Sequence, residues 1–274
     1  MQKIKIMKRI ILLVCTIVLF SGCSKSSSDT VVEPAQNRNL ITRVETTRDG
    51  NTKIENISYD GNKIIEFTTS GTDKARYTYV GNLLANSQSF ENNVSTGTTS
   101  YSYTGDKLTG IYRTEISNGG TGTTYRSRNA FTHNNDGTIN FIRYNISSAN
   151  VETQIGTGKY TFLNGNMIKE EYTCLTFNEI VTYTYDTKNN AIRNISGSDK
   201  LIDNEQNSVN NLLTSSQAKN ETPVGGTAYA TTLNNVYTYV YNTNNYITSE
   251  VRVQTSTNPF GPIPSSTQTK NYFY

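Results

Sequence analysis

The chain has 274 residues with 25 basic and 22 acidic side chains, so its formal net charge is +3. Asn, Thr and Ser account for 100 of the residues, whereas Ala occurs 9 times and Trp never. This composition favours strands and turns, and it excludes a helical bundle, a coiled coil and a doubly wound α/β enzyme. Aromatic residues make up 10% of the chain, which excludes an acidic or basic disordered tail as its overall class. The length allows one large domain or two small ones.

The N-terminus carries a predicted secretion signal. Residues 1–9 contain four basic side chains and no acidic one, and residues 10–20 form an apolar run too short to span a membrane as a helix. Ser21-Gly22-Cys23 follows and resembles a bacterial lipobox, although Phe20 stands where Leu is usual. We predict a signal peptide over residues 1–22 and lipidation of Cys23. The alternative is an ordinary cleaved signal followed by a chance cysteine.

Cleavage before Cys23 changes what the charge implies. It leaves 21 basic against 22 acidic side chains, so the mature chain offers no electrostatic argument for nucleic-acid binding. Cys174 is then the one cysteine left besides Cys23, and no intramolecular disulfide is expected. Residues 23–39 are predicted to be the lipidated cysteine and a flexible tether, because they are polar and lack apolar periodicity. We therefore expect a monomer anchored through its lipid to the outer membrane of a bacterial cell envelope.

A short unit recurs through the rest of the chain: two bulky, mostly aromatic residues around one small residue, then a turn pair and an aliphatic residue. Residues i and i+2 of a strand share a face, so each unit places two bulky side chains on one side. Gly-Asn and Asp-Gly pairs tolerate the positive φ of a hairpin turn. Seven full units and a terminal half unit begin at Ile57, Tyr77, Tyr101, Phe131, Tyr160, Tyr183, Tyr239 and Tyr272.

These units predict an all-β domain over residues 40–274, an antiparallel meander of about 14 to 16 strands that forms a strongly curved sheet or a barrel. Residues 186–235 break the pattern. There we predict a strand near 212–219, whereas residues 194–210 are either a loop or a short helix packed over one end of the sheet.

The Tyr-x-Tyr-x-x-Gly-Asn-x-Leu pattern resembles the YD (RHS-type) hairpin repeat, although Tyr-Asp stands only at Tyr59-Asp60 and Tyr185-Asp186. With the lipobox and residues 186–190 (DTKNN), the tandem hairpins resemble a group of Bacteroidota-type lipoproteins that share a porin-like domain of unknown function. The resemblance covers most of residues 40–274. It implies an antiparallel curved sheet or barrel and carries over no catalytic residue.

The residues that usually carry catalysis or metal binding are sparse. His133 is the only histidine, and it takes the second aromatic position of its unit, which favours packing over a Ser-His-Asp triad. Cys174 is expected to be a buried, inert thiol on a strand. No His or Cys cluster suits zinc, and we predict no cofactor.

Two groups of carboxylates are candidates for chemistry. Glu170 and Glu171 are neighbours on a predicted strand and should point to opposite faces, so they do not form the pair that a glycosidase needs. Asp199, Asp203 and Glu205 favour a solvated acidic loop over a calcium site, because their spacing matches no EF-hand. We therefore predict neither a catalytic residue nor a metal site.

The 19 tyrosines leave two interpretations open. The rings of Tyr79, Tyr103, Tyr185 and Tyr241 either fill the inside of a curved sheet or form an aromatic binding surface. Burial is favoured because a binding groove would rarely need the ring pair in every unit.

The predicted function is that of a non-enzymatic, membrane-anchored envelope lipoprotein that binds a glycan, a lipid or a protein partner. One alternative is a structural or assembly scaffold without a small-molecule ligand, and the least favoured is a hydrolase. A barrel that itself spans the membrane is disfavoured, because many outward positions would be Thr, Ser or Asn.

Overall fold

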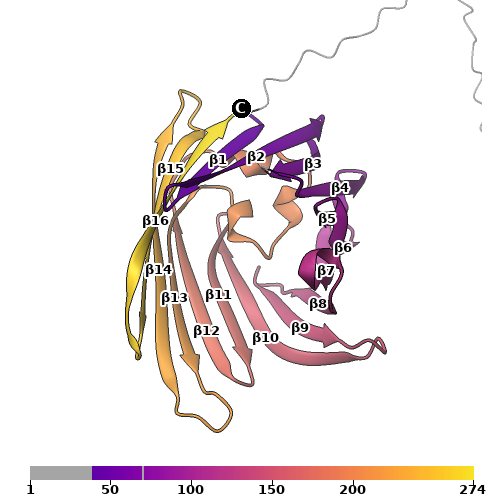
Figure 1. The fold of residues 1–274 in the computed structure, drawn as a ribbon, viewed down its shortest axis with the longest axis vertical. Helices are drawn as coiled ribbons and strands as arrows, with labels where there is room; N and C mark the ends of the chain where they lie inside the picture. Colours follow the sequence, from indigo (N-terminus) through magenta and orange to yellow (C-terminus); the bar gives the residue numbers. More distant parts are fainter. Residues whose placement is uncertain (1–38, 70) are drawn as a thin grey trace, which may run out of the picture. The chain divides into compact units, whose positions relative to one another are not determined.

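The described chain forms one closed antiparallel barrel of 16 strands, in which β1 pairs with β16 (Figure 1). The structure is a computed structural model that describes residues 39–69 and 71–274. The strands are β1 (Arg43–Arg48), β2 (Asn51–Asp60), β3 (Lys63–Thr69), β4 (Lys74–Val80), β5 (Leu83–Glu91), β6 (Val94–Thr104), β7 (Lys107–Ile116), β8 (Thr124–His133), β9 (Ile139–Ile146), β10 (Glu152–Leu163), β11 (Asn166–Cys174), β12 (Phe177–Tyr185), β13 (Leu212–Glu221), β14 (Tyr229–Tyr241), β15 (Ile247–Asn258) and β16 (Gly261–Phe273). The predicted all-β meander is confirmed. The predicted signal peptide, Cys23 and the tether up to residue 38 lie outside the described residues.

Helical structure within the described residues is limited to α1 (Ser117–Gly120) and the 3-10 helices η1 (Ala191–Asn194), η2 (Ser198–Lys200) and η3 (Glu205–Asn207). The 3-10 helices belong to the connection between β12 and β13, residues 186–211, which we call the plug. Figure 1 shows the plug folded inside one end of the barrel. The strand predicted near 212–219 is confirmed as β13, and the segment 194–210 lies within the barrel end. Of the helices in the described part of the chain, none is long and apolar enough to cross a membrane.

Glycine forms the tight turns at the plug end because these turns need a positive φ, which is unfavourable for residues with a β-carbon. Gly81 has a φ of 58° and opens a two-residue turn, as predicted. Gly165 also has a positive φ, at 77°. Its turn, however, is Asn164-Gly165 and not the predicted Gly165-Asn166, because Asn166 already begins β11.

Several hairpins shift register by one residue just after their plug-end turn. Between β4 and β5, Tyr79 pairs with Leu84 and Thr78 with Asn86, so Ala85 has no partner opposite it. Such β-bulges interrupt the hydrogen-bond ladder and increase the local twist, which helps a sheet to close into a barrel. Among the described strands, the residues left unpaired near this end are Ile65, Ala85, Thr109, Ile168, Leu213 and Thr248.

A side chain from a following strand binds the carbonyl next to most of these bulges. Tyr103 Oη donates to Leu84 O at 2.9 Å, and Leu84 immediately precedes the unpaired Ala85. A buried carbonyl without a partner costs about 1–3 kcal/mol, which explains why a hydroxyl is useful at this position of the repeat. The same contact recurs at Tyr185–Met167, Tyr239–Leu212, Tyr274–Ile247 and, with an imidazole, at His133–Leu108.

The buried residues of the main apolar core come from the consecutive strands β7 to β13. The rings of Phe141 and Tyr160 stack with centroids 4.5 Å apart, and both side chains are buried. Gly158 leaves the space for Phe141, since a β-carbon on Gly158 would lie 2.2 Å from that ring. The four tyrosines for which the sequence favours burial, Tyr79, Tyr103, Tyr185 and Tyr241, are partly buried, and none is exposed. Each stands at or next to the plug-end terminus of its strand, and Tyr103 and Tyr185 pack against this core.

Candidate functional site

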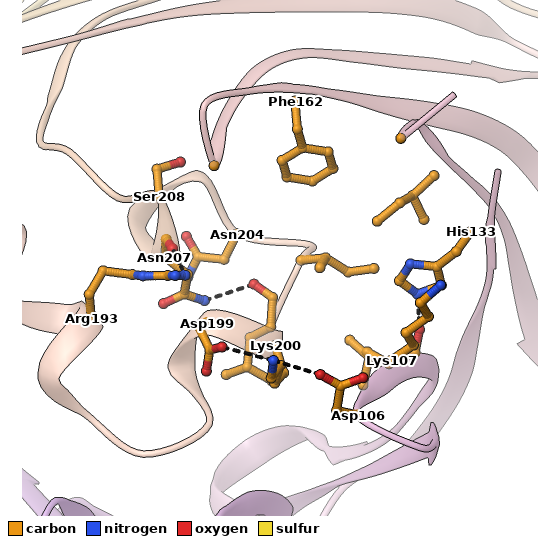
Figure 2. A pocket seen from close by; sticks show the side chains of 16 residues that line it. Asp106, Lys107, His133, Phe162, Arg193, Asp199, Lys200, Asn204, Asn207 and Ser208 are labelled. Atoms are coloured by element: carbon orange, nitrogen blue, oxygen red, sulfur yellow. Dashed lines mark hydrogen bonds and ion pairs between the residues drawn. The ribbon is translucent and has the colours of Figure 1, made fainter. Parts of the chain in front are cut away.

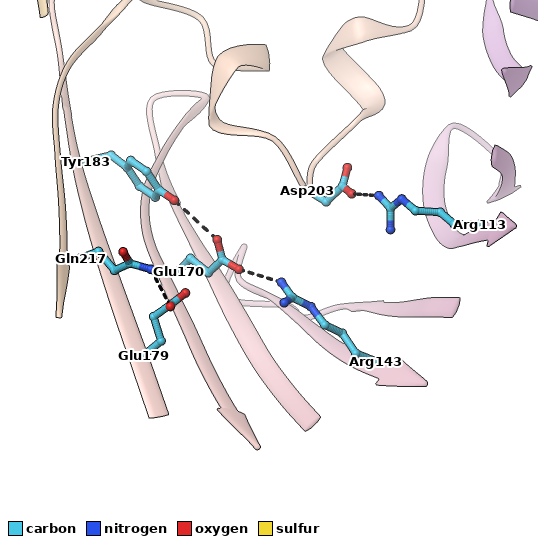
Figure 3. Close-up of polar contacts among 7 residues, drawn as sticks. All are labelled: Arg113, Arg143, Glu170, Glu179, Tyr183, Asp203 and Gln217. Atoms are coloured by element: carbon cyan, nitrogen blue, oxygen red, sulfur yellow. Dashed lines mark hydrogen bonds and ion pairs between the residues drawn. The ribbon is translucent and has the colours of Figure 1, made fainter. Parts of the chain in front are cut away.

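Ion pairs hold the plug against the barrel wall. Arg113 of β7 donates to Asp203 of the plug at 2.8 Å (Figure 3), and both side chains are partly buried. Lys200 donates to Asp106, in the turn between β6 and β7, at 2.9 Å. Residues of the plug contribute to the lining of two cavities.

The first cavity, which we call the chamber, has a volume of about 280 Å³ and lies between the plug and the strands β1–β3 and β13–β16. Its apolar lining comes from Ile41, Val44, Ile57, Phe67, Ala191, Ile192, Leu212 and Ile247. Its polar lining includes Glu55, Glu205, Glu250, Lys270 and the hydroxyl-bearing rings of Tyr239, Tyr272 and Tyr274. A mostly apolar cavity with a few placed polar groups is the usual form of a small-molecule site.

Glu250 gives the chamber a fixed charged group, and it is only 5% exposed. Tyr272 Oη donates to Glu250 Oε2 at 2.8 Å, and Lys270 Nζ lies 3.7 Å from Oε1. Burial, and then the Glu250 carboxylate, raises the pKa of Tyr272 well above its ordinary value. The phenol therefore stays protonated and continues to donate at physiological pH.

The second cavity, the rim pocket, has a volume of about 350 Å³ and lies between the plug and the turns after β6, β8 and β10 (Figure 2). Lys200 Nζ lies 2.9 Å from Asp106 and 3.0 Å from Asp199, so two carboxylates compensate its charge. His133 borders this pocket, but its Nε2 lies 2.8 Å from Leu108 O. The imidazole is thus engaged with the backbone, in keeping with its predicted packing role.

Two sets of polar contacts line the inner wall of the barrel from β9 to β13 (Figure 3). Arg143 donates to Glu170 at 3.0 Å, and Tyr183 Oη lies 3.5 Å from the other Glu170 oxygen. Gln217 donates to Glu179 at 2.6 Å. Burial raises the pKa of Glu170, and the nearby Arg143 charge offsets this effect only in part. Arg143 and Glu170 therefore form a partly buried ion pair on this inner wall.

The carboxylates singled out in the sequence do not form a site together. Glu170 faces the lumen, while Glu171 lies outside and accepts from Lys169 at 2.8 Å, which confirms their opposite faces. Asp199 and Asp203 bind different basic partners. Within residues 39–69 and 71–274, no group of three or more acidic, His or Cys side chains could hold a metal ion.

Cys174 differs from the expected buried thiol. It ends β11 and is partly exposed. Burial acts to raise the pKa of its thiol, but hydrogen bonds from Thr176 and Phe177 outweigh this effect and lower the pKa. Thr176 follows Cys174 by only two residues, so the tight turn between β11 and β12 produces the shift.

The four tyrosines predicted as a possible binding surface lie on β4, β6, β12 and β14, and the described chamber lining includes none of them. Tyr241 donates to Asp186 of the plug. Sequence reasoning missed Glu250 and Tyr272 as chamber residues. Strand alternation would have turned both side chains inward, but only the pairing of β1 with β16 places Val44 opposite Tyr272 and so closes the chamber wall.

The comparison with solved structures finds a distant likeness in fold. No protein-family model matches the sequence, and no curated protein is significantly similar to it. The chain is similar in structure to a porin-like protein from Bacteroides uniformis, with a TM-score of 0.48 and 11% sequence identity. The similarity covers 85% of this chain and 97% of that one.

Proposed function

We propose that this protein is a non-enzymatic lipoprotein of the cell envelope that holds a small amphipathic molecule in the chamber. The observation that carries the proposal is the mixed lining of that cavity. Its aliphatic wall suits a hydrocarbon or ring, while Glu250, Lys270 and the tyrosine hydroxyls suit a polar end. Of the partners considered from the sequence, a lipid-like ligand matches this lining better than a glycan, which would bury many hydroxyl groups.

The outer surface supports attachment by a lipid rather than insertion of the barrel. Hydroxyl and amide side chains pair across neighbouring strands on the outside, as in Thr232–Thr257 at 2.7 Å and Ser216–Asn234 at 2.7 Å. A barrel that spans a membrane instead needs an apolar outer band. The signal peptide and lipobox predicted at residues 1–23 would supply the anchor.

A ligand analysis of the full-length protein tests the proposal. The protein is isolated from its own envelope in mild detergent, and bound molecules are extracted and identified by mass spectrometry. Ala191→Leu fills the chamber, and Ala218→Leu makes the same change on the outer face. We expect an equimolar amphiphile in the parent and in Ala218→Leu, and its loss in Ala191→Leu. A parent without any bound molecule would instead favour the scaffold function.

A further inference from the structure

The two ends of the barrel carry different turns. The plug end has the polar repeat turns, such as Gly81-Asn82 and Gly105-Asp106. The opposite end, which we call the far rim, has a bulky apolar residue in four successive hairpin connections. These are Val151 (60% exposed), Leu175 (89%), Val224 (86%) and Phe260 (79%), between β9 and β10, β11 and β12, β13 and β14, and β15 and β16. We call these four residues the tips.

The connections that carry the tips are uncharged. Residues 147–151, 174–176, 222–228 and 258–261 contain no Asp, Glu, Lys or Arg. On the other half of the far rim, the connection after β1 contains Asp49 and the connection after β3 contains Asp73. Single exposed apolar residues are common on proteins, but four on successive uncharged turns of one half-rim are a pattern.

We propose that the tips insert into the interfacial region of a lipid bilayer, so that the far rim docks on a membrane surface. The tips stand on four separate hairpins, and a fluid bilayer accommodates separate side chains where a protein partner would need a matching pocket for each. Phe260 also packs edge-on against Tyr229, at 5.2 Å between centroids, and paired aromatic rings suit the membrane interface. Uncharged turns lower the cost of leaving water.

The length of the chain allows the predicted lipid on Cys23 to reach the same bilayer. Asn39 lies at the plug end, where its carbonyl accepts from Asn194. The 16 residues that follow Cys23 reach about 55 Å when extended, and a 13-residue strand such as β16 is about 44 Å long. The anchor and the tips can therefore engage one membrane from opposite ends of the barrel.

Tryptophan fluorescence tests the proposal, because the chain has no tryptophan of its own. Full-length protein with Phe260→Trp at a tip, or with Leu163→Trp at the plug end, is reconstituted in phosphatidylcholine vesicles. Leu163 is also exposed, at 58%, and serves as the matched control. We expect brominated acyl chains to quench Trp in the Phe260→Trp protein at least threefold more than in the control.

A second pair of variants shows whether the other tips take part. Adding Leu175→Ser and Val224→Ser to Phe260→Trp should reduce the quenching, whereas adding Val80→Ser at the plug end should not. Circular dichroism confirms that each variant is folded. Equal quenching at the two rims, or stronger quenching at the plug end, would overturn the proposal. Quenching that is absent while the tip variants alter self-association would assign the far rim to a second copy of the chain.

Discussion

His133 Nε2 lies 2.8 Å from Leu108 O, so the only histidine of the chain makes the contact that tyrosine hydroxyls make in other units. Leu108 precedes Thr109, which the register shift between β6 and β7 leaves without a partner. The hairpin of β8 and β9 has no such shift, and the corresponding ring on the next unit is Phe162, which has no donor. At these two positions a donor is present where the neighbouring hairpin is bulged and absent where it is not.

Removing this donor should destabilise the barrel. His133→Phe leaves the Leu108 carbonyl unpaired at a partly buried position, and we expect a loss of about 1–2 kcal/mol in the free energy of unfolding. His133→Tyr should lose much less, because it restores a donor. Phe162→Tyr is the control, and its added hydroxyl should not increase the free energy of unfolding. Urea denaturation measures all three, and equal stability of His133→Phe and the parent would contradict this account.

The turn glycines should resist substitution. Gly81→Val should lose about 1–2 kcal/mol, because a branched side chain is unfavourable at a φ of 58°. Gly165→Val should lose more, since its β-carbon would also lie 2.6 Å from Val209. Gly110→Ala is the control, because its φ is not positive and its nearest neighbour would be 3.6 Å away. Thermal melts that rank Gly110→Ala as the most harmful would refute the turn assignment.

Local sequence patterns predict the hairpins because the two strands and the turn of each hairpin are contiguous in the chain. The ring pair Tyr77 and Tyr79 and the turn at Gly81 suffice to place β4, its turn and its inward face. Closure does not follow from such patterns, since it depends on pairs such as Arg43–Phe273 that lie at opposite ends of the domain. The plug is hidden for the same reason: Asp203 meets Arg113 across 90 residues.

The half-buried tyrosines at the plug end should still contribute strongly to stability. Tyr103→Ala and Tyr185→Ala each remove the packing of the ring and its hydrogen bond to a carbonyl. We therefore expect each variant to lose about 3 kcal/mol in the free energy of unfolding. Tyr112→Ala, on the outer face, is the control and should lose far less. Melts of the two variants that match the parent would support a binding role for these rings instead.

The predicted lipid has a direct chemical test. Cys23→Ala removes the thiol that would carry the diacylglyceryl group, so intact-protein mass spectrometry should show the loss of the acyl mass. Cys174→Ala is the control and should leave the mass of the lipid unchanged. An acylated Cys23→Ala protein, or a parent that carries no lipid, would show that Ser21-Gly22-Cys23 is only a chance match.

Glu170 should make the stability of the barrel depend on pH. Burial raises its pKa in the folded state above the ordinary value of 4.5, despite the opposing charge of Arg143. Between pH 4.5 and the raised pKa of the folded state, the folded protein binds more protons than the unfolded chain. The free energy of unfolding therefore falls as pH rises through this window. Glu170→Gln removes the titrating group. As pH rises above 4.5, the free energy of unfolding of Glu170→Gln should therefore increase relative to that of the parent.

Glu171, the next residue, provides a control of opposite sign. The hydrogen bond from Lys169 on the outer face lowers the pKa of Glu171 below 4.5. Ionised Glu171 therefore stabilises the folded state above pH 4.5, and this stabilisation is lost as pH falls through the lowered pKa. Glu171→Gln should therefore lose stability relative to the parent as pH rises toward 4.5. Urea denaturation of the two variants between pH 3 and 7 should give relative stabilities that change with pH in opposite directions. Parallel trends would mean that the two carboxylates do not differ in environment as their opposite faces require.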